Sequence, residues 1–204
     1  MLRRCTGSAK KANRVIPSIA QCFRLMEQYA MLPNIREHSV MVGRVARLIG
    51  QGLARAGRNL SQELIVTGAL LHDIAKTASL DTELRHDELG REICLRHGFD
   101  ELAEIVAEHV VLKNGLPDRC MEKEIVYYAD KRVLHDEIVT LEERLDYIIH
   151  RYGNGDEGLH ARIRKNFAQA HAIEELLFGE LDFSPEELGE RLNRDGFLLE
   201  AFGA

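Results

Sequence analysis

Apolar residues recur along this chain at intervals of three and four, the spacing of amphipathic helices, and strand-like alternation is almost absent. Only four prolines interrupt the pattern. The periodicity predicts an all-α fold with helices over the following ranges: 17–30, 34–56, 61–76, 87–97, 100–112, 121–135, 140–152, 157–178 and 184–194. With 204 residues, the chain can form a compact helical bundle with a core of its own and an appendage.

The helical pattern divides the chain into three predicted parts. We expect a flexible N-terminal arm at 1–15, a helical domain at 16–153 and a C-terminal helical extension at 154–204. The break before the extension is predicted at Gly153-Asn154-Gly155, because this sequence favours a turn. The extension is amphipathic and carries few polar residues in apolar surroundings. It therefore serves packing or subunit contact, which leaves a homodimer open.

Composition excludes several classes of protein. Hydrophobic residues make up 45% and charged residues 29%, as in ordinary globular domains. The net charge of −6 argues against broad binding of nucleic acid or anionic membranes. No apolar run approaches the roughly 18 residues of a membrane span, and the four cysteines lack CxxC spacing. We expect a cytoplasmic protein that binds neither membranes nor, stably, nucleic acid.

One dipeptide is out of place in this pattern. His72 and Asp73 follow Gly68-Ala69-Leu70-Leu71, in a segment that reads as a buried helix. Burying an unpaired polar group costs about 2–7 kcal/mol, and a charge costs more. Either the two side chains pair with neighbouring groups, or a metal ion lies between them.

Further polar residues lie in apolar stretches of other predicted helices. His38 lies in such a stretch, as does His109, and Asp130 ends another. His86 lies in a polar run and, taken alone, reads as a surface residue. Each histidine alone is more often a hydrogen-bonded core residue than a ligand, but convergence on one ionic centre explains them together. Imidazoles mixed with carboxylates, without thiolates, suit Mn²⁺, Fe²⁺, Co²⁺, Ni²⁺ or Zn²⁺, and Mg²⁺ also fits carboxylate ligands.

The order His38, His72-Asp73, Asp130 resembles the H…HD…D signature of the HD-domain metal-dependent phosphohydrolases. The resemblance covers about residues 30–150. It implies an all-α bundle with the metal held between helices and these four residues as ligands. It also implies that a metal-activated water cleaves a phosphate ester or anhydride, with Asp73 as a catalytic residue that orients the water.

Two further histidines bear on the number of metal ions. His86 and His109 stand where some HD subfamilies place the ligands of a second ion, as in the HD-GYP phosphodiesterases and the HD-type diadenosine tetraphosphate hydrolases. The GYP motif itself is absent, so hydrolysis of cyclic di-GMP is not expected. The alternative is that both histidines make ordinary polar contacts. One ion or two therefore stays open.

Cations close to the signature are candidates for binding phosphate. Lys76 follows His72 by one helical turn, and related HD enzymes use a lysine here to contact phosphate, so we expect Lys76 to bind substrate and to take part in catalysis. It could equally cap the end of its helix. Lys131 and Arg132 follow Asp130 directly, and either could reach a phosphate or form a surface salt bridge.

The sequence therefore predicts a metal-dependent phosphohydrolase whose substrate is a small phosphorylated compound, most plausibly a nucleotide. The alternative is a non-catalytic or regulatory HD module that binds a nucleotide or metal without turnover. A panel of nucleotides and phosphodiesters assayed with several divalent metals separates the two.

Overall fold

Residues 15–194 are described by a computed structural model, and they confirm the predicted all-α class. The predicted arm at 1–15 lies almost entirely outside the described residues, as does the end of the predicted extension after residue 194. The elements follow in this order: α1 Ile19–Gln28, α2 Pro33–Arg55, α3 Gln62–Leu71, α4 Lys76–Ser79, α5 His86–Arg96, α6 Asp100–Glu108, α7 Glu122–Lys131, β1 Val133–Leu134, β2 Glu137–Ile138, α8 Leu141–Tyr152, α9 Glu157–Phe178, a short 3₁₀ turn Pro185–Glu187 and α10 Leu188–Arg194.

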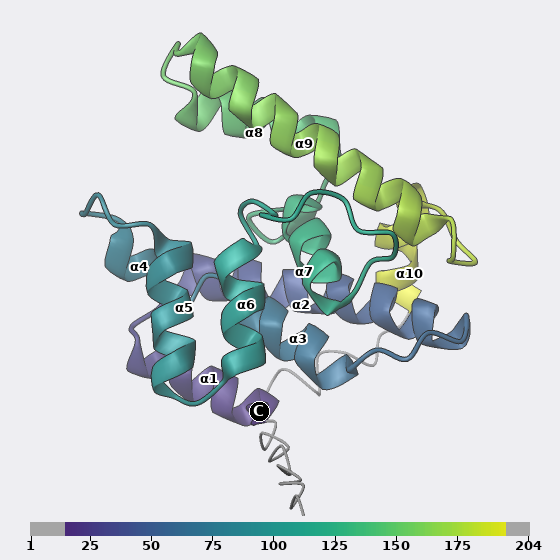
Figure 1. Cartoon of the computed structure of the whole chain (residues 1–204), viewed down its shortest axis with the longest axis horizontal. Coiled ribbons are helices and arrows are strands. Elements are labelled where there is room, and N and C mark those ends of the chain that lie inside the picture. The colour runs from purple at the N-terminus through teal and green to yellow at the C-terminus, as the bar shows by residue number, and fades with distance from the viewer. Residues whose placement is uncertain (1–14, 195–204) are drawn as a thin grey trace, which may run out of the picture.

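The centre of the bundle is formed by α2, α3 and α7, which pack on one another, while α5 and α6 form a pair beside them (Figure 1). The sequence of α3 is apolar on every side, and eight of its ten residues are buried, as expected for a helix enclosed by neighbours. Fully buried Ile65, Leu70 and Tyr127 belong to this core. Within residues 15–194, the structure contains no helix with the length and apolarity needed to cross a bilayer.

The predicted helix 61–76 is wrong in its last turn, because α3 ends at Leu71 and residues 72–75 form tight turns. The amides of Ile74 and Lys76 each donate to a carbonyl three residues earlier, at 3.0 and 2.9 Å, in place of the α-helical partner. The Nδ1 atom of His72 donates a hydrogen bond to the carbonyl of Ala69 at 2.7 Å. His72 and Asp73 therefore lie in the turn after α3 rather than within a helix.

The predicted helix 121–135 is also too long. The last helix residue of α7 is Lys131, and a short antiparallel hairpin follows in which Val133 pairs with Ile138. His135, expected on a helix surface, lies at the tip of this hairpin with φ 56°. In the same way α6 ends at Glu108 rather than at 112, so His109 lies just beyond its helix.

The C-terminal part forms a helical hairpin that packs against α7 through α9 (Figure 1). The start of α8 has a capping box, in which Thr140 and Glu143 satisfy each other's amides. The predicted break before α9 contains two residues with positive φ, Asn154 at 48° and Gly155 at 70°. These observations agree with a helical extension. The division of the chain at residue 153 as a domain boundary stays a prediction.

Gly90 sets the approach of α5 to α6, and its replacement is expected to destabilise the protein. A Cβ at this position would lie 2.6 Å from Cγ1 of Val106. Overpacking of this kind costs about 1–3 kcal/mol, so Gly90→Ala should lower the free energy of unfolding by that amount. Urea denaturation measures it. Gly189→Ala on α10 is the matched control, because no atom of the described residues lies within 4 Å of a Cβ placed there, so no loss is expected. Equal stability of both variants would contradict the proposed packing.

Candidate metal centre

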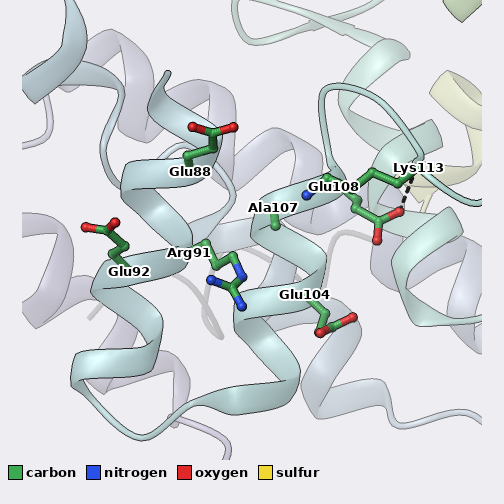
Figure 2. A pocket seen from close by; sticks show the side chains of 7 residues that line it. All are labelled: Glu88, Arg91, Glu92, Glu104, Ala107, Glu108 and Lys113. Carbon is green, nitrogen blue, oxygen red and sulfur yellow. Dashed lines mark hydrogen bonds between the residues drawn. The ribbon is translucent and has the colours of Figure 1, made fainter. Parts of the chain in front are cut away.

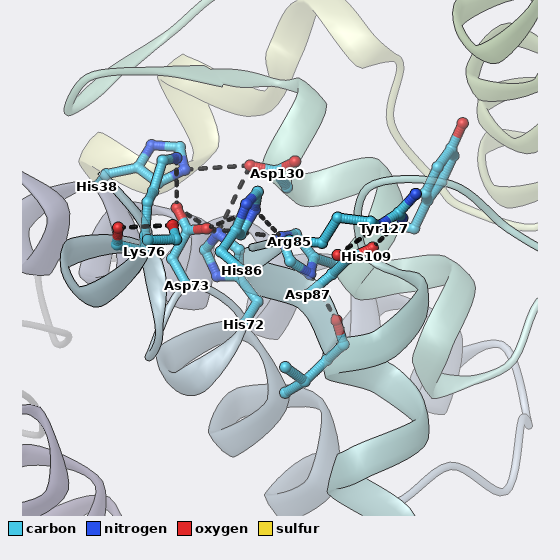
Figure 3. Close-up of polar contacts among 12 residues, drawn as sticks. His38, His72, Asp73, Lys76, Arg85, His86, Asp87, His109, Tyr127 and Asp130 are labelled. Carbon is cyan, nitrogen blue, oxygen red and sulfur yellow. Dashed lines mark hydrogen bonds and ion pairs between the residues drawn. The ribbon is translucent and has the colours of Figure 1, made fainter. Parts of the chain in front are cut away.

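The six side chains predicted as ligands meet in one cluster between the helices (Figure 3). They come from five places in the bundle. The side chains are His38 from α2, His72 and Asp73 from the turn after α3, His86 from the start of α5, His109 from the end of α6, and Asp130 from the last turn of α7. All but His86 and Asp130 are buried.

Backbone carbonyls fix the orientation of three of the imidazoles. The Nδ1 atom of each ring lies at hydrogen-bond distance from a backbone carbonyl. The pairs are His38 with the carbonyl of His135 at 2.9 Å, His72 with that of Ala69 at 2.7 Å, and His109 with that of Val106 at 2.7 Å. A carbonyl can only accept, so the Nδ1 atom of each ring carries a proton. In a neutral imidazole the Nε2 lone pair is then free and faces the cluster. Metal-binding histidines show this arrangement, because the anchored nitrogen orients the ligating one.

Three residues form the first half of the cluster around Asp130. The Nε2 atom of His38 lies 3.1 Å from Oδ1 of Asp130. The Nε2 atom of His72 lies 3.6 Å from the same oxygen and 3.4 Å from Oδ2 of Asp73. Ligand atoms of His38, His72 and Asp73 all lie within 4.8 Å of one another, so they could hold one ion.

The second half of the cluster is centred on the other oxygen of Asp73. Its Oδ1 atom lies 3.4 Å from Nε2 of His86 and 3.5 Å from Nε2 of His109. The two imidazole nitrogens face each other at 3.2 Å. These three residues form a second group whose ligand atoms lie within 4.8 Å of one another. Asp73 thus belongs to both groups and presents one oxygen to each.

The donor set fits a divalent cation, because two buried atoms at its centre find no hydrogen-bond partner among the residues that the structure describes. These are Nε2 of His72 and Oδ1 of Asp73. Leaving a buried polar atom unsatisfied costs about 1–3 kcal/mol. A proton on His72 would offset part of that cost, and a cation bound between the nitrogen and the oxygens would offset it at both atoms.

The charges of the cluster also favour a cation. Burial lowers the pKa of His72, but the carboxylates of Asp73 and Asp130 outweigh it and raise that pKa to about 10. Burial raises the pKa of Asp73, but Lys76 and His72 hold it well below its usual value. The carboxylates therefore stay ionised and attract positive charge, whether a proton or a metal ion supplies it. Metal ligands must shed their protons, so metal and proton compete here.

His86 differs from the other histidines in its exposure and in its charge. Burial and the neighbouring His109 lower its pKa to about 4, so the imidazole is neutral at pH 7. A neutral imidazole is the form that binds metals. The polar sequence around His86 suggested a surface residue, but the side chain is 28% exposed and faces the cluster.

Lys76 lies beside the cluster, as predicted. It is the first residue of α4, and its ammonium donates to Oδ2 of Asp73 at 2.6 Å. A third of its side chain is exposed, so the ammonium borders both the cluster and solvent. This geometry agrees with a phosphate contact and does not resemble a helix C-cap.

Lys131 is not a surface cation. Its side chain is buried, the ammonium donates to the carbonyl of His109 at 2.9 Å, and it lies 3.6 Å from the ring centre of Tyr127. Burial lowers the pKa of this lysine to about 8, although Asp130 opposes the shift. The ammonium is 3.8 Å from Oδ2 of Asp130. Its hydrogen bonds tie α7 to the turn after α6, so its contacts are structural.

Arg132 makes its contacts with other parts of the bundle rather than with the clustered side chains, and its role in substrate binding stays a prediction. Its guanidinium donates to the carbonyls of Val139 at 2.7 Å and Pro185 at 3.1 Å, and to Glu174 of α9 at 3.0 Å. The side chain is buried. The sequence could not show this, because the partners of Arg132 come from segments up to 53 residues away.

Sequence reasoning missed part of the environment of the cluster. Asp87 is buried beside His109, and Arg85 donates to it through Nε at 3.1 Å (Figure 3). The carbonyl acceptors of the imidazoles were missed as well, and no side-chain pattern signals a carbonyl. The polar run Arg85-His86-Asp87-Glu88 was a signal, but it was read as solvent-exposed.

A separate hollow of about 460 Å³ lies between α5 and α6 (Figure 2). Its lining is dominated by carboxylates and includes Arg91 and Lys113 as cations. None of the six clustered side chains lines it. Glu108, its most buried carboxylate, is satisfied by the amide of Lys113 at 2.9 Å and by Lys123 at 3.0 Å. The hollow is therefore a polar surface feature rather than part of the metal centre.

Comparisons with known proteins extend these findings. The chain is 30% identical over 133 residues to an uncharacterized protein of Methanocaldococcus jannaschii, covering 55% of this chain and 78% of that one. It is 35% identical over 98 residues to ribonuclease Y of Treponema denticola, covering 48% of this chain and 18% of the enzyme. It is 27% identical over 150 residues to a tRNA (cytidine(56)-2'-O)-methyltransferase of Thermoplasma volcanium, covering 67% of this chain and 42% of the enzyme. No solved structure matches significantly.

The two named enzymes are much longer than the matched region, so the chain corresponds to a part of each. The family comparison is more direct, because residues 35–136 match the HD domain. That span contains all six clustered side chains and the hairpin whose His135 carbonyl anchors His38. Together with the helical fold and the H…HD…D order, the match shows that this chain belongs to the HD domain family.

Proposed function

We propose that this protein is a phosphohydrolase that depends on two divalent ions and cleaves a phosphate ester or anhydride of a nucleotide. The observation that carries the proposal is the position of Asp73, which presents one carboxylate oxygen to each of two histidine groups. A single ion needs only one of these groups. The narrower resemblance to diadenosine tetraphosphate hydrolases stays a prediction.

The chain's own residues would divide the work as follows. His38, His72, Asp73 and Asp130 would hold one ion, and Asp73, His86 and His109 the other. Bound ions of this kind activate water and polarise the phosphoryl group. Asp73 stays ionised, and its oxygens would orient the ions and the water bound to them. Its low pKa makes it a weak base. Lys76 holds positive charge at the exposed edge, where it can neutralise a phosphate oxygen.

The test is turnover of a panel of nucleotides and simple phosphodiesters with Mn²⁺, Co²⁺, Ni²⁺ or Mg²⁺. We expect hydrolysis that requires metal and that stops when a chelator is added. Lys76→Met should retain metal and lose about ten- to a hundredfold in kcat/KM, because one charge at the reacting phosphate is removed. Metal binding without turnover of any compound would instead favour a regulatory HD module.

Hydrolysis of RNA is the second function that an observation favours, since part of the chain is similar to ribonuclease Y. The net charge of −6 does not favour tight binding of a long polyanion. An oligoribonucleotide in the same panel decides between the two. Faster cleavage of the oligomer than of any mononucleotide would replace the proposed substrate class.

A further inference from the structure

Protein covers one side of the metal cluster only partly, so this side is open to solvent. His72 and Asp73 are completely buried, whereas the side chains of His86 and Lys76 are 28% and 33% exposed. Asp130 contributes a smaller exposed edge of 14%. A substrate must therefore reach the cluster past these three residues.

Helix α8 borders this side. The ring of Tyr147 meets the ring of His135 edge-on at 5.6 Å, and the carbonyl of His135 accepts the proton of His38. At the far end of the helix, Tyr152 lies within electrostatic reach of Lys76. Near the start of the helix, Arg144 lies close enough to Lys131 for the two positive charges to repel each other. The contact of Tyr147 with His135, whose carbonyl anchors His38, places α8 beside the cluster.

Two arginines on α8 have no acidic partner in the described part of the chain. Arg144 and Arg151 are seven residues apart, which places them on the same face of a helix. Among residues 15–194, neither guanidinium forms an ion pair or a hydrogen bond with a side chain or carbonyl. Each instead lies over a tyrosine ring, Arg144 over Tyr147 at 5.7 Å and Arg151 over Tyr152 at 5.6 Å. Both keep their donors available for an anion.

We infer that α8 binds the non-reacting part of a nucleoside phosphate. Arg144 and Arg151 hold phosphate oxygens beyond the phosphorus that is attacked, and Tyr152 stacks on the base. Arginine suits this role because its planar fork binds phosphate through paired hydrogen bonds. Tyr152 is 49% exposed at the end of the helix, so its ring face is accessible to a base. The inference rests on the proposed function for the phosphate that lies at the metals.

The test is a binding measurement that needs no turnover. Isothermal titration with Mn²⁺ present compares three probes: adenosine 5'-(α,β-methylene)diphosphate, methylenediphosphonate and inorganic phosphate. The variants are the double substitution Arg144→Gln/Arg151→Gln and the single substitution Tyr152→Ala. The control Arg55→Gln/Arg96→Gln removes the same charge from exposed helix ends elsewhere. Circular dichroism and bound Mn²⁺ report whether each variant is folded and loaded.

The double variant should bind both diphosphate probes at least about tenfold more weakly and inorganic phosphate within about threefold of wild type. Tyr152→Ala should weaken only the nucleotide analogue, by about tenfold. The inference is overturned if the control pair weakens binding as much, if all three probes weaken together, or if wild-type protein does not bind the analogue. The measurement detects binding and not hydrolysis. If the protein proved not to hydrolyse nucleotides, these results would still decide whether α8 binds them.

Discussion

Replacing Asp73 by Asn should abolish metal binding and turnover together. Asp73 belongs to both histidine groups, so the substitution weakens a ligand and removes a negative charge in each. Substituting partners that merely orient a metal ligand costs about 10–100-fold. The loss of a ligand common to two sites should exceed that, and we expect kcat/KM to fall by more than about a hundredfold. Elemental analysis and a metal-dependent assay measure the two effects.

The fold should survive this substitution, because the amide is the same size and can donate to an imidazole nitrogen. A circular dichroism melt checks it. Asp100→Asn is the matched control, since Asp100 is exposed at the start of α6, away from the cluster. Wild-type turnover by a metal-free Asp73→Asn protein would show that the cluster does not carry the reaction.

Replacing Arg132 by Met should strongly reduce stability while leaving the metal cluster in place. The substitution leaves Glu174 without its buried cation and removes the donors to two carbonyls. Breaking one partner of a buried ion pair costs about 3–5 kcal/mol. Denaturant unfolding should show a loss of that size, and bound metal at low temperature should be close to wild type.

An exposed ion pair provides the comparison. Arg194 pairs with Glu190 on the surface of α10, and Arg194→Met should change stability by about 0.5 kcal/mol or less. If Arg132→Met left stability unchanged but raised KM, Arg132 would bind substrate, as its place beside Asp130 suggested. The structure favours the first outcome, because the Arg132 guanidinium lies among α9 and the turn before α10.

The sequence predicted the helical class and most helix positions, because the apolar periodicity is strong and the capping residues are local. It failed where a helix ends inside an apolar run. His72 and Asp73 follow a buried helix whose periodicity continues smoothly past Leu71. At the break the imidazole of His72 donates to the carbonyl of Ala69, a contact that the apolar periodicity does not record.

Five of the six clustered side chains were predicted because each is a polar exception in an apolar segment. His86 lies in a polar run and was predicted only by its place in some HD subfamilies. No sequence pattern indicates where the side chains of Lys131 and Arg132 lie. The two residues are adjacent in sequence, yet Lys131 donates to the carbonyl of His109 and Arg132 to the carboxylate of Glu174. Only the packing of α7 against α6 and α9 decides this. The free arginines of α8 were overlooked for the same reason, since an amphipathic helix commonly exposes arginine.

The number of metal ions bound per chain tests the account most directly. Equilibrium dialysis against Mn²⁺, followed by elemental analysis, gives this number for wild-type protein and for the double variant His86→Gln/His109→Gln. We expect two ions in the wild type and one in the variant, because only the group around Asp130 then remains complete. A wild-type protein that binds no Mn²⁺, or the same number of ions in both proteins, would contradict the shared role of Asp73.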